Sequence, residues 1–127
     1  MASRIIYLDT HVLVWLYADP TLLSPPARQA VEESQLLCSP AAILELEYLF
    51  ETRRINVRAL TVLQYLAPRL ELAQCDLPFS DVVRTALDEN WTRDPFDRLI
   101  TAQARLRNVA ILSKDKYIQA NYHQAFW

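Results

Sequence analysis

The chain has 127 residues, of which 52% are apolar and 22% charged, and its formal net charge is −2 at pH 7. That length fits a single domain over residues 1–127, and the richness in Leu, Ile and aromatic residues excludes a mainly disordered chain. The acidic balance excludes a broadly basic nucleic-acid coat, and the lack of an apolar stretch of about 20 residues excludes a membrane span.

The first half of the chain predicts short apolar strands that alternate with helices. Ser24 and Ser39 are each followed by proline, a pattern typical of a helix N-cap with proline at the first helical position. In chain order, the expected elements are a strand at Arg4–Leu8, a helix at His11–Tyr17, a turn at Asp19–Pro20, a helix at Pro25–Glu33, a strand at Leu36–Cys38, a helix from Pro40 to about Arg53 and a helix at Val57–Leu66.

The second half continues the alternation. We expect a strand within Leu70–Leu77, a helix at Ser80–Glu89 capped by Ser80, a helix from Asp94–Pro95 to Arg107, a strand at Val109–Ser113, a helix at Asp115–Ala120 and a fifth strand in the aromatic tail. Strands that alternate with helices predict a parallel sheet covered on both faces. In such sheets ligands bind beyond the carboxyl ends of the strands.

The chain contains no glycine, and its two cysteines are isolated. A phosphate-binding P-loop and a dinucleotide fingerprint both require glycines, so both are excluded. The left-handed backbone positions at helix ends must therefore be occupied by residues other than glycine, and we expect Asn90 and Asn108 to occupy two of them. No signal peptide is recognised, so we expect a cytoplasmic protein in which Cys38 and Cys75 are reduced thiols.

Four acids come from four separate segments and could converge at one edge of the sheet. Asp9 follows the first strand, Glu45 lies two turns into the helix after the second, Asp97 lies in the first turn of its helix, and Asp115 follows the fourth strand. Clustered carboxylates suit Mg²⁺ or Mn²⁺. Each position also has a simpler explanation, because Asp9 and Asp115 could cap helices and Asp97 could favour the helix dipole.

The helix that holds Glu45 also holds Glu47, and their side chains point roughly 200° apart around the axis. Glu47 lies on a charged flank with Glu51 and Arg54, which predicts a solvated face. Glu45 has small and apolar neighbours, which leaves room for an ion, so we favour Glu45 as the functional residue.

For two side chains near these acids, His11 and Arg98, we prefer a structural role to a functional one. His11 is expected to be a packing or surface residue rather than part of a site. Arg98 projects about 100° away from Asp97 and either contacts phosphate or pairs with an acid, and the structural pairing is preferred.

Four segments carry a resemblance that covers nearly the whole chain: YLDTHVLVWL at Tyr7–Leu16, SPAAILEL at Ser39–Leu46, RDPFDRLITAQA at Arg93–Ala104 and ILSKDKYI at Ile111–Ile118. On these motifs the chain resembles the PIN-domain family and, more narrowly, the VapC-type toxins of bacterial toxin–antitoxin systems. The resemblance implies a three-layer α/β/α PIN-like domain with a central parallel sheet of four to five short strands. It also implies a Mg²⁺- or Mn²⁺-dependent endoribonuclease that leaves 5′-phosphate and 3′-hydroxyl ends.

By motif position, the resemblance places the catalytic and metal-binding acids on Asp9, Glu45, Asp97 and Asp115, with Thr10 and Ser113 as supporting polar residues. Asp9 and Asp97 would be the principal ligands, Glu45 would bind directly or through water, and Asp115 would be an outer or second-metal ligand. Two departures from the family pattern stand out. Thr92 replaces a usual histidine, and Arg53-Arg54-Ile55-Asn56 stands where a glycine is common.

The segment from Arg93 to Lys116 holds six basic residues against three acids. This balance indicates either RNA binding by Arg93, Arg98, Lys114 and Lys116 or a helix with a basic solvent face. The resemblance further implies a homodimer and a small antitoxin partner that covers the acidic groove. The helices at Val12–Tyr17 and Val57–Leu66 could supply such contacts or belong to the core.

Two other functions remain open from the residues alone. The first is a carboxylate phosphotransferase or receiver-like domain that phosphorylates Asp9. It is disfavoured because position 11 is His rather than a second Asp, and no acidic pair lies near the end of the first strand. The second is a catalytically inactive module that binds RNA or protein, which the retention of all four acids disfavours.

Overall fold

The computed structural model describes residues 4–127, so residues 1–3 of the expected domain lie outside it. Within this range the strands are β1 (Ile5–Leu8), β2 (Gln35–Cys38), β3 (Ala73–Gln74), β4 (Ala110–Leu112) and β5 (Ala125–Phe126). They form one sheet in the order β3-β2-β1-β4-β5, and every neighbouring pair is parallel. The predicted parallel sheet of short strands is confirmed.

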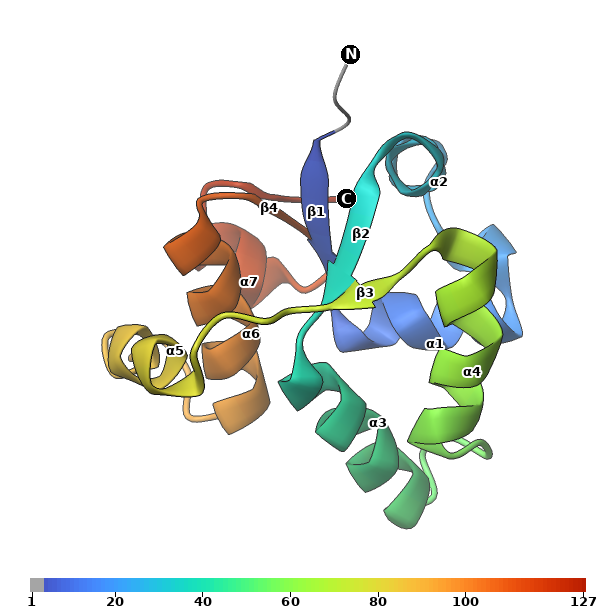
Figure 1. The fold of residues 1–127 in the computed structure, drawn as a ribbon, viewed down its shortest axis with the longest axis horizontal. Helices are drawn as coiled ribbons and strands as arrows, with labels where there is room; N and C mark the ends of the chain where they lie inside the picture. The colour runs from blue at the N-terminus through green and yellow to red at the C-terminus, as the bar shows by residue number, and fades with distance from the viewer. Residues whose placement is uncertain (1–3) are drawn as a thin grey trace.

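The helices are α1 (Thr10–Ala18), α2 (Pro25–Glu33), α3 (Pro40–Glu51), α4 (Ala59–Leu70), α5 (Phe79–Ala86), α6 (Pro95–Arg107) and α7 (Lys116–Asn121), with a 3₁₀ turn at Pro20–Leu22. Figure 1 shows α1, α2 and α4 on one side of the sheet and α5, α6 and α7 on the other. This is the expected three-layer α/β/α arrangement. Along the described chain, none of the helices combines the length and apolar character that a membrane crossing requires.

The central strand β1 is covered on both faces. Ile6 lies opposite Leu36 on one side and Ala110 on the other, and it is fully buried. Ile6 and Leu8 pack into the larger core, whereas Tyr7 points to the opposite face and packs into a second cluster. Burial on both faces explains why this strand reads as a continuous apolar run rather than an alternating one.

Helix starts follow the predicted caps at most positions. The side chains of Ser24, Ser39 and Asp94 each accept a hydrogen bond from the first turn of the helix that follows. The prediction for Ser80 was wrong, because α5 begins one residue earlier, after Pro78, with no side-chain cap. Proline fixes φ near the helical value, so the chain enters the helix before Ser80 is reached.

Two helix boundaries also differ from expectation. Helix α4 begins at Ala59 rather than Val57, because the Ala59 N–H donates to the Glu47 carboxylate, and it continues to Leu70. Helix α5 ends at Ala86, three residues before Glu89, which is buried against Arg105 instead.

Three residues take left-handed backbone conformations without glycine: Arg53 (φ 62°), Glu71 (φ 51°) and Asn108 (φ 57°). The prediction for Asn108 is confirmed, since it is the C-cap of α6. The prediction for Asn90 was wrong, because the left-handed positions fall at the ends of α3 and α4 instead. Both cysteines are free and buried.

Candidate active site at the carboxyl edge of the sheet

The carboxyl ends of β1 and β4 meet at one edge, and the polar residues that follow them meet there too. The Asp9 N–H donates to the Leu112 carbonyl across 3.1 Å, which places the start of α1 beside the segment Ser113–Asp115. Helix α3 leaves the same edge from β2, and α6 packs against α3. The four predicted acids therefore approach one another from β1, α3, α6 and α7.

Asp9 is held by two hydrogen bonds at the end of β1 and is only 4% exposed. One oxygen, Oδ1, accepts from the Thr10 N–H at 2.8 Å, and the other, Oδ2, accepts from the Ser113 hydroxyl at 2.6 Å. The Ser113 hydroxyl in turn accepts from the Asp115 N–H at 3.0 Å. Ser113 thus links Asp9 to the segment that carries Asp115.

Thr10 connects Asp9 to Glu45. Its backbone N–H is bound to Asp9, and its hydroxyl donates to Glu45 Oε1. Thr10 and Ser113 are both buried, so their hydroxyls fix the carboxylates from inside the protein. Both hydroxyls therefore contact a predicted acid directly, Thr10 contacting Glu45 and Ser113 contacting Asp9.

Two of the acids have pKa values well above those of ordinary carboxyl groups. Burial, together with the neighbouring carboxylates Asp94, Asp9, Glu45 and Asp115, raises the pKa of Asp97 to about 8. Burial and the acids at positions 9, 94 and 115 raise the pKa of Glu45 to about 7, although the Thr10 hydrogen bond lowers it. Asp97 and Glu45 thus both respond to the charges of the acids around them.

The simpler explanation, helix capping, also holds for some of these residues. Asp9 caps α1, and one oxygen of Asp115 accepts from the N–H groups of Tyr117 and Ile118 at the start of α7. Capping uses Oδ1 of Asp115, and within residues 4–127 no hydrogen bond to its other oxygen is formed. Asp97 does not cap its own helix, because Asp94 performs that role for α6.

His11 touches the acidic edge, which the sequence interpretation as a packing or surface residue missed. Its Nδ1 lies 3.4 Å from Asp9 Oδ2, and its Nε2 accepts from the Lys114 N–H at 3.0 Å. Burial lowers the pKa of His11, opposed by the charges of Asp9 and Asp115. Because Nε2 accepts a hydrogen bond, the ring proton lies on Nδ1, toward Asp9. Its place two residues after Asp9, in the first turn of α1, was the available signal.

The two arginines predicted to bind RNA are anchored to backbone carbonyls rather than to acids. Arg98 Nε donates to the Thr92 carbonyl at 2.9 Å, and Arg93 Nη1 donates to the Asn90 carbonyl at 2.9 Å. The expected pairing of Arg98 with an acid is therefore replaced by a carbonyl contact. Thr92 stands where the family resemblance leads us to expect histidine, and its hydroxyl accepts a hydrogen bond from the Asp94 N–H at 3.1 Å.

A metal ion fits the chemistry of this edge, although the side chains are not closed around one. Among residues 4–127, no three His, Cys, Asp or Glu side chains already form a ready-made metal cluster. The donors available are carboxylate and hydroxyl oxygens, which Mg²⁺ and Mn²⁺ prefer. The raised pKa values of Asp97 and Glu45 show that ionising these carboxyls is costly at this edge, a cost that a divalent cation would offset.

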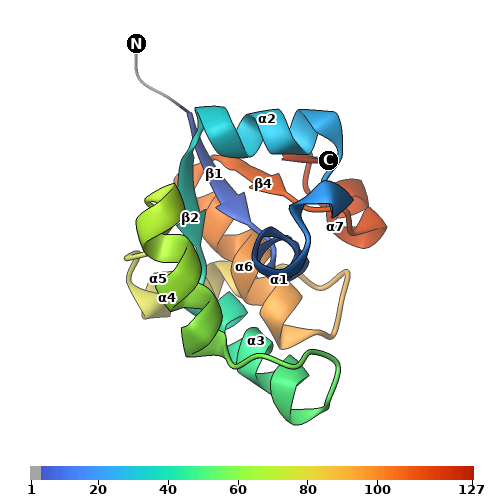
Figure 2. The same ribbon diagram turned by 90° about the vertical axis from the view of Figure 1, so that its right-hand side faces the viewer.

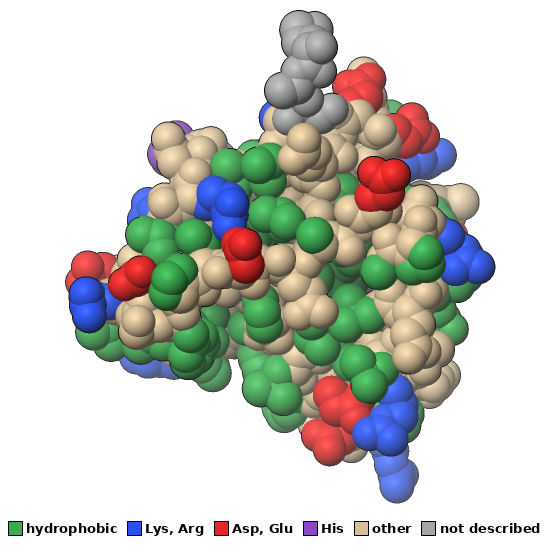
Figure 3. All heavy atoms as spheres, viewed as in Figure 1, with side chains coloured by type: hydrophobic (Ala, Val, Ile, Leu, Met, Phe, Trp, Pro, Cys, Tyr) green, Lys and Arg blue, Asp and Glu red, His purple; other side chains and the backbone are tan. Residues whose placement is uncertain are grey.

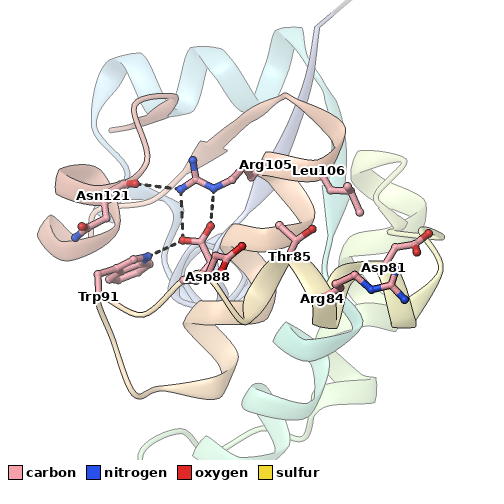
Figure 4. Close-up of a pocket in the computed structure, with 9 residues that line it drawn as sticks. Asp81, Arg84, Thr85, Asp88, Trp91, Arg105, Leu106 and Asn121 are labelled. Carbon is pink, nitrogen blue, oxygen red and sulfur yellow. Dashed lines mark hydrogen bonds and ion pairs between the residues drawn. The ribbon is translucent and has the colours of Figure 1, made fainter.

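A cavity of about 650 Å³ lies away from the acids, between α5, α6 and the end of α7 (Figure 4). Its floor contains the buried Glu89, which accepts from Trp91 Nε1 at 2.6 Å and from Arg105 Nε at 2.5 Å. Arg105 also donates to the Asn121 carbonyl at 3.1 Å. Since the Glu89 carboxylate is fully paired, this cluster joins the α5–α6 loop to α7 and is not a second active site.

Comparison with solved structures defines the class of fold. The chain shares its fold with a protein of the crystal structure of VapBC2 from Rickettsia felis bound to a DNA fragment from their promoter, with a TM-score of 0.64 over 96% of each chain and 14% sequence identity. The sequence model of the PIN domain matches residues 6–123, and this chain belongs to the PIN domain family. Ribonuclease VapC22 of Mycobacterium tuberculosis is 32% identical over 121 residues, which cover 93% of this chain and 92% of that relative.

Proposed function

We propose that this protein is an endoribonuclease that hydrolyses RNA phosphodiesters with Mg²⁺ or Mn²⁺ at the carboxyl edge of the sheet. The observation that carries the proposal is the approach of Asp9, Glu45, Asp97 and Asp115 from four elements, with the pKa values of Asp97 and Glu45 raised by burial and by the neighbouring acids. The relationship to Ribonuclease VapC22 supports RNA as the substrate. The family assignment leaves no support for the phosphotransferase alternative.

The residues at this edge divide into ligands and residues that orient them. Asp9 and Asp97 would hold the ion, Glu45 would bind it directly or through water, and Asp115 would be an outer or second-metal ligand. The ion would lower the pKa of a bound water and stabilise charge on the leaving oxygen. The Thr10 hydroxyl orients Glu45, and the Ser113 hydroxyl holds Asp9 toward the site.

RNA would be held beside the acids by basic side chains. The candidates are Arg93, Arg98, Lys114 and Lys116. Arg93 is fixed through Nη1 by the carbonyls of Asn90 and Thr92, and Arg98 is fixed through Nε by the Thr92 carbonyl, so their other guanidinium N–H groups are oriented for phosphate.

The test is cleavage of RNA by the wild type and by the Asp9→Asn variant in the presence of Mg²⁺ or Mn²⁺. We expect the variant to lose at least 100-fold in rate, by analogy with the roughly 10²–10³-fold effect of removing one electrostatic contact in an active site. A chelator should abolish the wild-type activity. Glu47→Gln is the matched control, since Glu47 lies on the same helix as Glu45 but pairs with Arg58. Equal activity in wild type and Asp9→Asn would mean a contaminating nuclease and would end the proposal.

We further propose that the protein is the toxin of a toxin–antitoxin pair and acts in the cytoplasm. The support comes from the names of its relatives, a VapC ribonuclease and a VapBC complex. A short reading frame for a DNA-binding antitoxin beside this gene, whose product relieves growth arrest on co-expression, is the expected finding. A lone gene that is harmless when overexpressed would contradict the toxin role.

An apolar surface over α3 supports the proposed homodimer. Hollows of about 520 and 360 Å³ lie on either side of a ridge formed by Pro40 and Leu44. Leu44 and Leu60 are each 64% exposed and Phe79 is 67% exposed. Figure 3 shows hydrophobic side chains gathered over and between α3 and α5. A ridge flanked by hollows can match a second copy of itself, and the paired Glu47 and Arg58 at the rim add no net charge.

The two helices suggested from sequence for partner contacts are largely part of the core. Val12 and Leu13 of α1 are fully buried, as is Val62 of α4. Helix α4 still contributes Leu60 to the apolar surface, so only its outer face is free for a partner.

A further inference from the structure

Three aromatic rings lie together at the acidic edge, and the proposed cleavage mechanism does not use them. They are His11, Trp15 and Trp127, which we call the aromatic cluster. The ring centres of Trp15 and Trp127 are 5.5 Å apart with an edge-on geometry, and the His11 ring lies 5.0 Å from Trp15 and 6.0 Å from Trp127. Trp15 and Trp127 are each only partly buried.

The topology of the sheet puts this cluster beside the acids. Strand β5 is parallel to β4, and the Ser113 N–H donates to the Phe126 carbonyl at 2.9 Å. Trp127 therefore leaves the sheet at the same edge as Ser113 and Asp115. Trp15 follows His11 by one helical turn, so both side chains lie on one face of α1. Trp15 and Trp127 both pack against the larger core, and in Figure 2 the C-terminus lies on the same side of β1 and β2 as α1.

His11 connects the two indole rings of the cluster to the acids. His11 contacts Asp9 through Nδ1 at 3.4 Å and contacts both indole rings through its own ring. The Lys114 ammonium lies 5.6 Å from the centre of the Trp15 ring, which adds a positive charge beside the aromatic surface. A flat aromatic surface next to a cation is the combination that binds unpaired nucleotides, since the rings stack on bases and the cation attracts phosphate.

We propose that the aromatic cluster is a subsite for one unpaired nucleobase of the RNA substrate, adjacent to the phosphate that is cut. This proposal rests on the proposed ribonuclease function. Trp15 and Trp127 provide the stacking surface, and Lys114 binds the neighbouring phosphate. The subsite selects single-stranded RNA, because a base inside a duplex cannot reach a ring at the protein surface.

The test compares the affinity of the full chain for two oligomers of equal length, a uridine 10-mer and an abasic 10-mer with the same ribose-phosphate backbone. Every protein variant in this experiment also carries Asp97→Asn, so that the RNA is not cut while its binding is measured. Trp127→Leu keeps an apolar side chain for packing but removes the flat ring. We expect it to bind the uridine oligomer roughly tenfold more weakly, because base stacking on one aromatic side chain contributes about 1–3 kcal/mol. Its affinity for the abasic oligomer should not change.

Two further variants separate stacking from packing. Trp127→Phe retains a flat ring and should keep most of the affinity, and Tyr65→Ala on α4 removes an exposed aromatic away from the acids and should change nothing. Thermal melting confirms that each chain is folded. Equal binding of uridine and abasic oligomers by the parent chain, or unchanged binding in folded Trp127→Leu and Trp15→Leu, would overturn the subsite. The proposed ribonuclease function is tested independently, by comparing RNA cleavage by the wild type and by Asp9→Asn as described above.

Discussion

Ionising clustered acids reduces the stability of the folded protein, and Asp97 shows this effect most strongly. Its carboxylate is half-buried and surrounded by other acids, and its pKa rises from the ordinary 3.8 to about 8. Between those two pH values the folded protein keeps a proton that the unfolded chain has released. The folded state therefore loses stability as pH rises from about 4 to about 8, because the deprotonated form is the one that folding disfavours.

Asp97→Asn should remove this loss. In metal-free buffer at pH 8, we expect the variant to be more stable than the wild type by about 1–2 kcal/mol, a few degrees in Tm, with little difference near pH 4. Mg²⁺ should raise the Tm of the wild type and have less effect on the variant. Thermal melting across pH measures both.

Asp88→Asn is the matched control, because Asp88 is exposed and lies outside the acidic edge. A metal-free wild type whose Tm at pH 8 equals that of Asp97→Asn would show that Asp97 carries no such penalty.

At this scale the sequence predicts much of the site but not its finer contacts. The acids could be placed because each follows a strand or opens a helix at a common edge, which is a consequence of parallel topology. The contact of His11 with Asp9 could not be predicted from the sequence, because it depends on how the first turn of α1 approaches Lys114, which is 103 residues away from His11. Long-range approach of that kind leaves no local pattern.

The helices and loops show where local signals succeed and fail. Pro25–Glu33 was predicted with its correct bounds, because a serine cap and a proline start define its first turn. The start of α4 was misplaced because its first N–H is satisfied by Glu47 from another helix. The end of α3 explains a departure from the family pattern. Arg53 is left-handed and opens the stretch Arg53-Arg54-Ile55-Asn56, where the family resemblance leads us to expect a glycine, and a left-handed non-glycine residue costs roughly 1–2 kcal/mol.

Glu89 of the α5–α6 loop forms an ion pair with Arg105 of α6, and we predict that removing one partner destabilises the fold more than removing the other. The side chain of Glu89 is 3% exposed, whereas that of Arg105 is 40% exposed. Arg105→Ala would leave a buried carboxylate without its cation and should destabilise the fold by about 3 kcal/mol. Glu89→Ala would leave a cation that reaches water and should cost about 1–2 kcal/mol.

Urea unfolding of the two variants measures the difference. Arg84→Ala is the control, since Arg84 lines the same cavity but forms no ion pair in the described chain. If Glu89→Ala proved the more damaging of the two, the buried carboxylate would not be the group that needs its partner.

For the whole molecule, the apolar surface over α3 predicts the oligomeric state. Leu44→Glu places a charge on the ridge between the two hollows and should convert a dimer to a monomer without unfolding the chain. Light scattering after size-exclusion chromatography measures the mass of the particle. Leu87→Glu is the control, because Leu87 is 66% exposed and lies at the end of α5 outside both hollows. A wild type that is monomeric at high concentration, or a dimer that survives Leu44→Glu, would contradict this interface.

The position of β1 in the middle of the sheet has a consequence for how the protein is made. Its neighbour β2 is synthesised soon after it, but the contact between Asp9 and Ser113 spans 104 residues. Folds with such distant contacts form slowly, because a long loop must close before the contact contributes. A nascent chain therefore has no complete acidic edge until β4 has left the ribosome. The proposed ribonuclease site is therefore completed only when most of the chain has been synthesised.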